Sequence, residues 1–142
     1  MRKTAILAVM LAGLPLNAFA MNVVATCTPQ GGTSVAGGKS TPVTKASLKG
    51  TTWTYAWFAG KADAKITLKS AGEQPVAQDA NVMASSEEMV TFVVLQKSSF
   101  WTHTLFMDKN MMHGSAVFSE HTTDDAGKIT SQQVRAICKI TM

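Results

Sequence analysis

The feature that most constrains the fold is a series of short runs rich in Thr, Val, Trp, Tyr and Phe, which begins at Trp53. Clusters of Gly, Asn, Asp or Lys separate these runs at fairly even spacing, which is typical of an antiparallel β protein. We expect strands at residues 52–59, 64–70, 75–84, 88–97, 99–107, 112–122 and 131–141. About seven such strands predict an all-β fold, either a small antiparallel barrel or a curled sandwich.

Strand periodicity is favoured over helix periodicity throughout this region. The nearest helix candidate, residues 77–90, is rich in Ala, Gln, Met and Glu. Its apolar positions follow neither the helical nor the strand period cleanly. We therefore expect at most one short helix, or a turn, at residues 84–89.

Alternation along a strand predicts which side chains share a face. The last strand is expected to point Cys138 inward, in a row with Val134, Ala136 and Ile140. A row of three rings, Trp53, Tyr55 and Trp57, shares one face of the first run. Such a row is either an exposed binding surface or the core face of a barrel strand, and the small residues opposite it favour the core.

Residues 28–52 are dominated by Gly, Ser, Thr, Pro and Lys and contain almost nothing to bury. This composition predicts that residues 21–51 form an N-terminal tail or long loop carrying Cys27, ahead of a β domain at residues 52–142. Residues 42–50 have an alternative as a short edge strand, because proline is tolerated where a strand starts.

Residues 1–20 are predicted to be a secretory signal peptide. Arg2 and Lys3 precede an apolar stretch, and Ala18-Phe19-Ala20 supplies the small residues of a cleavage site. Pro15 and Asn17 interrupt the apolar run before the roughly 20 residues that a spanning helix needs, so no transmembrane anchor is expected after cleavage. The protein is therefore expected to be periplasmic or secreted, and the remaining chain has the length of one domain.

The sequence contains two cysteines, Cys27 and Cys138. In an oxidising compartment, two cysteines of a small exported chain most often pair, so we expect a disulfide that joins the beginning of the domain to its last strand. A lipobox ending at Cys27, which would make this residue an acylated N-terminus, is one alternative. A thiol pair that binds metal or acts in redox chemistry is another, although no Cys-x-x-Cys spacing supports it.

The formal net charge of +4 falls to +2 when Arg2 and Lys3 are removed with the signal peptide, which is too small to indicate nucleic-acid binding. Lysines are nevertheless concentrated between residues 39 and 69, where they face only Asp63. These six candidates for binding an anionic partner are Lys39, Lys45, Lys49, Lys61, Lys65 and Lys69. The alternative is an ordinary solvated face.

Methionine and histidine cluster around the predicted turn after residue 107. Thioether and imidazole ligands together suit Cu(I), so we consider Met107, Met112, His113 and His103 as candidate ligands. The neighbours Met111 and Met112 point to opposite sides of a strand. Methionine also fills irregular gaps in cores, and no zinc-type spacing is present, so a structural role is the competing interpretation.

Motifs for nucleophilic catalysis, paired acid and base carboxylates, or phosphate binding are not recognisable in the sequence. The favoured interpretation is an exported non-enzymatic β domain that binds a macromolecule of the cell envelope, either another protein or a polysaccharide. The alternative is a small carrier of Cu(I) or of a small molecule, and no other cofactor is predicted. An enzyme whose site assembles from scattered strand residues is a third class.

Overall fold

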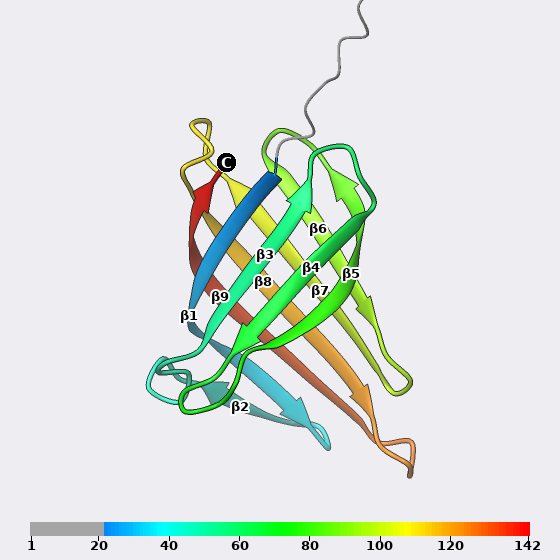
Figure 1. The fold of residues 1–142 in the computed structure, drawn as a ribbon. Coiled ribbons are helices and arrows are strands. Elements are labelled where there is room, and N and C mark those ends of the chain that lie inside the picture. The colour runs from blue at the N-terminus through cyan, green and yellow to red at the C-terminus, as the bar shows by residue number, and fades with distance from the viewer. Residues whose placement is uncertain (1–21) are drawn as a thin grey trace, which may run out of the picture.

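Nine antiparallel strands and their connections make up the part of the protein that the computed structural model describes, residues 22–142 (Figure 1). The strands are β1 (Asn22–Ala36), β2 (Lys39–Val43), β3 (Thr52–Phe58), β4 (Asp63–Lys69), β5 (Val76–Ser85), β6 (Met89–Leu95), β7 (Ser99–Met107), β8 (His113–Thr123) and β9 (Ile129–Thr141). The signal peptide predicted at residues 1–20 lies outside the described residues.

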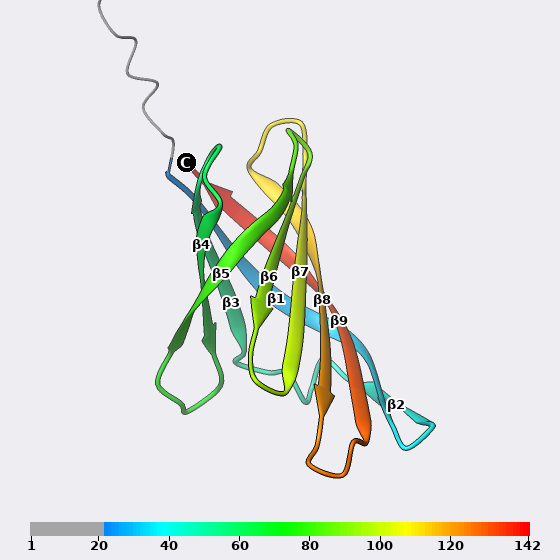
Figure 2. The same cartoon turned by 90° about the vertical axis from the view of Figure 1, so that its right-hand side faces the viewer.

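Eight of the strands close into a barrel. Each strand from β3 to β9 pairs with its neighbour in sequence, and β1 completes the ring by pairing with both β3 and β9. The ribbon views show this ring from two sides (Figures 1 and 2). The predicted all-β class is thus confirmed as a barrel, in which closure leaves few unpaired strand edges. Strand β2 pairs with the second half of β1, from Gly32 to Ala36, beyond the ring.

The prediction of a tail or loop at residues 21–51 was wrong for most of that segment. Residues 22–36 form the 15-residue strand β1, and β2 follows as its hairpin partner, so the strand count rises from about seven to nine. Glycine makes both features possible. At Gly32 a Cβ would overlap the backbone carbonyl of Gln133 on β9. Gly37 and Gly38, with φ of 56° and 76°, form the tight turn between β1 and β2.

The strands predicted from Trp53 onward are confirmed within a few residues at each end. No helix occurs at residues 84–89, where β5 ends and a tight turn begins. The backbone N–H of Ser86 donates to the carbonyl of Met89, and the Ser86 hydroxyl accepts from the N–H groups of Glu88 and Met89. These hydrogen bonds satisfy backbone N–H and carbonyl groups of the turn without a helix. The edge strand considered at residues 42–50 instead ends at Val43.

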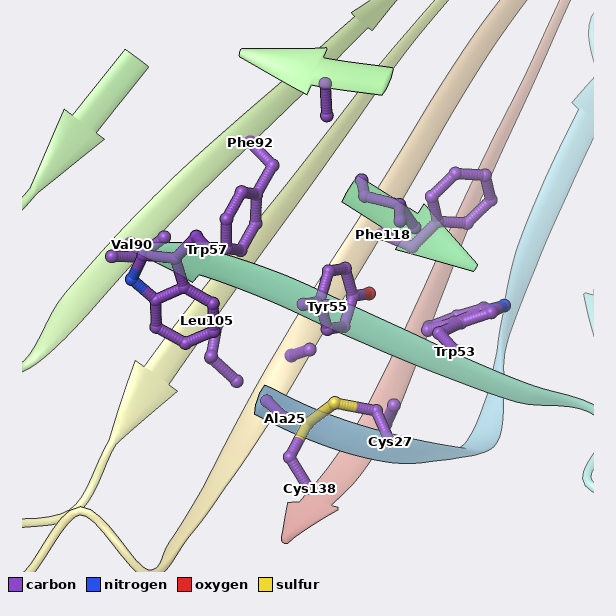
Figure 3. Close-up of a cluster of buried hydrophobic side chains, with 14 of the residues drawn as sticks. Ala25, Cys27, Trp53, Tyr55, Trp57, Val90, Phe92, Leu105, Phe118 and Cys138 are labelled. Atoms are coloured by element: carbon purple, nitrogen blue, oxygen red, sulfur yellow. A yellow bond between two sulfur atoms is a disulfide. The ribbon is translucent and has the colours of Figure 1, made fainter. Parts of the chain in front are cut away.

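The core fills the barrel interior. It is built from every second residue of the strands, whose side chains point inward. Trp53, Tyr55 and Trp57 all point inward and are at most 4% exposed, as predicted. Tyr55 stacks on Phe92 with ring centroids 5.3 Å apart, and Trp57 meets Phe92 edge to face at the same distance. Figure 3 shows these rings converging from β3 and β6, together with Phe118 from β8. The interior is therefore a packed aromatic and aliphatic core.

The predicted disulfide joins Cys27 on β1 to Cys138 on β9. The two residues lie directly opposite each other in the β1–β9 pairing, and both side chains are buried inside the barrel (Figure 3). The disulfide therefore lies across the seam where the first and last strands of the barrel meet. Because the Cys27 sulfur is bonded here, it is not available for acylation in this form of the protein.

Candidate functional site

The candidate site is an open cavity of about 460 Å³ at one end of the barrel. This end, here called the mouth end, carries the β2–β3, β4–β5, β6–β7 and β8–β9 connections and lies at the bottom of Figure 1. Residues that line the mouth cavity are Ser47, Leu48, Lys49, Thr51, Trp53, Leu68, Ser70, Ala71, Trp101, Phe118, Glu120 and Gln132. The strand residues among them lie on β3 and β4 on one side and on β7, β8 and β9 on the other, and the rest belong to the β2–β3 and β4–β5 connections. Because these two groups of strands are not neighbours in the sheet, the cavity lies between opposite walls of the barrel, at the end of its packed core.

Aromatic rings form the floor of the mouth cavity. The rings of Trp53 and Phe118 lie 5.3 Å apart between centroids, and Trp101 meets Phe118 edge to face at 6.2 Å. These three residues converge from β3, β7 and β8, and Trp53 and Phe118 are also members of the core. Aromatic faces at such a site offer a large apolar surface with a preferred geometry for a second ring.

His103 lies directly beneath this floor and is fully buried. Its ring is 4.6 Å from the Phe118 ring and 5.9 Å from the Trp53 ring, measured between centroids. The Tyr55 hydroxyl lies 2.7 Å from His103 Nδ1 and forms a hydrogen bond with it. Burial lowers the pKa of His103 to about 3 and raises that of Tyr55 above its usual range, so both are neutral at ordinary pH. His103 Nε2 has no protein partner among the described residues.

One wall of the mouth cavity is polar. Glu120 on β8 pairs in register with Trp101 on β7 and with Gln132 on β9, so the three side chains form a row across adjacent strands. The Thr122 hydroxyl donates to Glu120 Oε1 at 3.2 Å. The half-buried Glu120 carboxylate and the Gln132 amide thus offer hydrogen-bond acceptors beside the aromatic floor. The Trp101 indole N–H is buried without a partner in the described part of the chain.

A short loop between β2 and β3 covers part of the cavity. Its turns are held by hydrogen bonds from the N–H of Leu48 to the carbonyl of Lys45, and from the N–H of Thr51 to the carbonyl of Leu48. The Leu48 side chain packs against the core, and Leu48 and Lys49 also line a second cavity of about 480 Å³ beside Pro29. The loop therefore lies between the mouth cavity and this second cavity.

A larger hollow of about 590 Å³ lies elsewhere, between the β6–β7 and β8–β9 turns. Its walls include Phe100, which stacks on His121 at 6.5 Å, and Asp124. Asp124 Oδ1 accepts hydrogen bonds from the backbone N–H groups of Ala126 and Lys128, so this carboxylate shapes its own turn. We favour the mouth cavity because its side chains converge from opposite walls of the barrel, whereas this hollow is formed by two neighbouring turns.

The structure separates the residues considered as Cu(I) ligands. His103 and Met107 point into the barrel and are buried, whereas Met112 is 59% exposed and His113 lies on the outer surface. His103 and His113 are therefore on opposite faces of the barrel wall. No group of three or more His, Cys, Asp or Glu residues within residues 22–142 could hold a metal ion. Binding of Cu(I) by this hairpin stays a prediction.

The six candidate lysines are only partly brought together. Lys39, Lys45, Lys49 and Lys69 lie at the mouth end, whereas Lys61 is in the β3–β4 turn at the other end. Lys65 lies midway along β4 and forms an ion pair of 3.3 Å with Asp79. Two lysines that the sequence analysis did not group with them, Lys97 and Lys128, also lie in connections at the mouth end.

Sequence reasoning did not single out Glu120 or Gln132. Their signal was available as strand alternation, because Glu120 shares the inward face of its strand with Phe118, and Gln132 shares that of Val134. A polar residue in the inward register at the end of a strand indicates a lining position at a barrel mouth. Trp101 carries the same signal, because it shares the inward face of its strand with His103.

Comparison of the sequence with models of known protein families and with curated proteins finds no match. Within residues 22–142, the structure contains no helix with the length and hydropathy needed to cross a membrane.

Proposed function

We propose that the protein is an exported carrier that binds a small, planar and largely apolar molecule in the mouth cavity. The observation that carries this proposal is the convergence of Trp53, Trp101 and Phe118 from opposite walls on one open cavity. Ligand sites are commonly concave and mostly apolar with a few polar groups that fix orientation, and mouths of β-barrels are among their preferred places. A volume of about 460 Å³ accommodates a ring system of a few fused rings.

The polar wall selects the chemistry of the ligand. Glu120 and Gln132 present acceptors beside the aromatic floor, and a carboxylate strengthens a hydrogen bond from a cationic donor. Aromatic faces also attract cations. Lys49 also lines the cavity, but its side chain is exposed and its ammonium group is carried on a flexible stem. The favoured ligand is therefore a planar aromatic molecule that carries an amine or another hydrogen-bond donor.

Two features support a location outside the cytoplasm. The sequence pattern of residues 1–20 predicts export, and the Cys27–Cys138 disulfide is consistent with an oxidising compartment. The proposal keeps the small-molecule carrier of the sequence analysis and moves its site from the Met107 to His113 hairpin to the mouth cavity.

The test uses three naphthyl compounds that share a ring and differ in charge: naphthylethylamine, naphthylethanol and naphthylacetate. The indole N–H resonances of the three tryptophans report on binding by NMR. We expect Trp53 and Trp101, which line the cavity, to shift while Trp57, which lies deeper on β3, stays in place. Affinity should fall in the order amine, alcohol, acetate.

Glu120→Gln should reduce the preference for the amine over the alcohol by about tenfold, because a charged hydrogen bond is replaced by a neutral one. The matched control is Glu73→Gln, which removes a carboxylate from the same end of the barrel but outside the lining. Absence of shifts at Trp53 and Trp101 with every compound, or equal shifts at all three tryptophans, would contradict the proposal.

A further inference from the structure

The two ends of the barrel differ in charge. Connections at the mouth end and the residues flanking them carry six exposed lysines: Lys39, Lys45, Lys49, Lys69, Lys97 and Lys128. Three carboxylates accompany them, Glu73, Asp124 and Asp125, with Glu120 inside the cavity. At the far end three lysines, Lys61, Lys109 and Lys139, are outnumbered by four carboxylates, Asp63, Glu87, Glu88 and Asp108. The mouth end is thus positive and the far end negative.

Exposed apolar side chains accompany the lysines of the mouth end at each hairpin. Val35 lies near Lys39 in the β1–β2 hairpin, and Val76 lies opposite Leu68, the neighbour of Lys69. The β6–β7 hairpin presents Leu95 and Phe100 on either side of Lys97, and Ile129 follows Lys128. The exposed fractions of these apolar side chains are 39% for Val35, 56% for Val76, 71% for Leu95, 41% for Phe100 and 64% for Ile129.

We propose that the mouth end docks on an anionic lipid surface. Lysines beside exposed aliphatic and aromatic side chains are the combination by which peripheral proteins bind such membranes, since the lysines attract anionic headgroups and the apolar groups enter the interface. A polysaccharide would engage the lysines but would leave Val35, Val76, Leu95 and Ile129 without a complementary surface. The apolar members of the set therefore favour lipid over an anionic sugar polymer.

The barrel geometry orients the docked protein. All four hairpins of this surface lie at the end that carries the mouth cavity, as Figures 1 and 2 show for the β1–β2, β4–β5, β6–β7 and β8–β9 connections. Docking by this end would turn the cavity toward the membrane. The inference goes beyond ligand binding, because it rests on surface residues outside the cavity and can be tested with no ligand present.

Co-sedimentation with lipid vesicles tests the proposal on the disulfide-bonded protein without its signal segment. Vesicles of equal parts phosphatidylglycerol and phosphatidylcholine should retain the protein, and vesicles of phosphatidylcholine alone should retain far less. Lys97→Glu combined with Lys128→Glu should weaken partitioning at least about tenfold, because each lysine near an anionic surface contributes several-fold to binding. The matched control, Lys61→Glu with Lys109→Glu, changes net charge equally at the far end and should retain most of the binding.

The apolar contribution is tested separately with Leu95→Ser and Ile129→Ser, compared with Met83→Ser and Met112→Ser on other exposed surface. Only the first pair should weaken partitioning at about 1 M salt, where electrostatic attraction is screened. Three results would overturn the proposal: no retention on anionic vesicles, equal losses for the two lysine pairs, or retention by dextran sulfate without retention by vesicles. Circular dichroism checks that each variant keeps the fold, and naphthyl-compound binding is scored independently.

Discussion

The hydrogen bond between Tyr55 and His103 places two polar side chains in an otherwise apolar interior. Each satisfies one polar atom of the other at 2.7 Å, which offsets much of the cost of removing these groups from water. His103 Nε2 remains without a protein partner in the described residues, and such a buried group costs about 1 to 3 kcal/mol unless water or a ligand reaches it. His103 is therefore tolerated only in its neutral form.

This neutrality predicts a loss of stability in acid. Burial lowers the pKa of His103 to about 3, below the value of about 6.5 in an unfolded chain, so the unfolded state binds more protons between these values. The contribution of neutral His103 to the free energy of unfolding is complete above about pH 6.5, and it is lost as the pH falls toward 3. Between about pH 7 and about pH 4.5, His103 should account for about 2 to 3 kcal/mol of lost unfolding free energy.

Urea unfolding at the two pH values measures this loss, which should shrink in His103→Gln and persist in the control His121→Gln, whose ring lies on the outer surface. NMR titration of the imidazole provides an independent measurement in the unmodified protein. Movement of the His103 ring resonances with a midpoint near pH 6 would show that the imidazole protonates in the folded state and would refute the prediction.

At the scale of single elements, β1 depends on a glycine at one position. The backbone of Gly32 lies so close to β9 that a Cβ would overlap the Gln133 carbonyl, and backbone atoms cannot yield as a flexible side chain can. Gly32→Ala should therefore destabilise the protein by at least about 3 kcal/mol, at the upper end of overpacking effects. Thermal or urea denaturation measures this change.

The control for this substitution is Gly38→Ala in the β1–β2 turn. Its φ of 76° is unfavourable for alanine, but no atom lies within 4 Å of the added Cβ, so a cost of about 1 to 2 kcal/mol is expected. Equal effects of the two substitutions would mean that β1 and β9 separate at Gly32 more easily than their pairing indicates.

Strand β1 also shows which part of the fold local sequence patterns do not predict. Strands from β3 onward were predictable because apolar and polar residues alternate and turn residues punctuate them, as at Asp108. In β1, residues 28–36 have few apolar side chains. Their extended conformation is fixed by pairing with β9, which lies at the other end of the sequence, and with β2, which follows directly. Gly37-Gly38 was a usable hairpin signal, but without flanking alternation it resembled a loop.

At the scale of the whole molecule, the mouth cavity depends on barrel closure. Alternation predicts that Trp53 points inward on its strand and that Trp101 shares a face with His103. It does not predict that these strands face each other across a lumen, because strand order and closure are non-local properties. Glu120 gains its place beside the aromatic floor only when β7, β8 and β9 complete the wall.

Closure also determines what the disulfide does. Cys27 and Cys138 are 111 positions apart in sequence and join the two strands that meet at the seam of the barrel. Constraining so long a loop in the unfolded chain stabilises the fold by about 4.7 kcal/mol in the chain-entropy model, which is a large part of the stability of a typical domain. Because both residues are buried, reductants should reach the bond only when β1 and β9 separate.

We therefore expect Cys27→Ala combined with Cys138→Ala to keep the barrel fold, since the β1–β9 backbone pairing is retained, but to unfold at a much lower urea concentration. A reduction of unfolding free energy by about 3 to 5 kcal/mol is predicted. Unmodified protein unfolded in dithiothreitol should match the double variant, whereas dithiothreitol should not change the variant itself. Equal urea midpoints for the oxidised and fully reduced protein would show that strand pairing alone secures the seam, and would remove the stabilising role assigned to this bond.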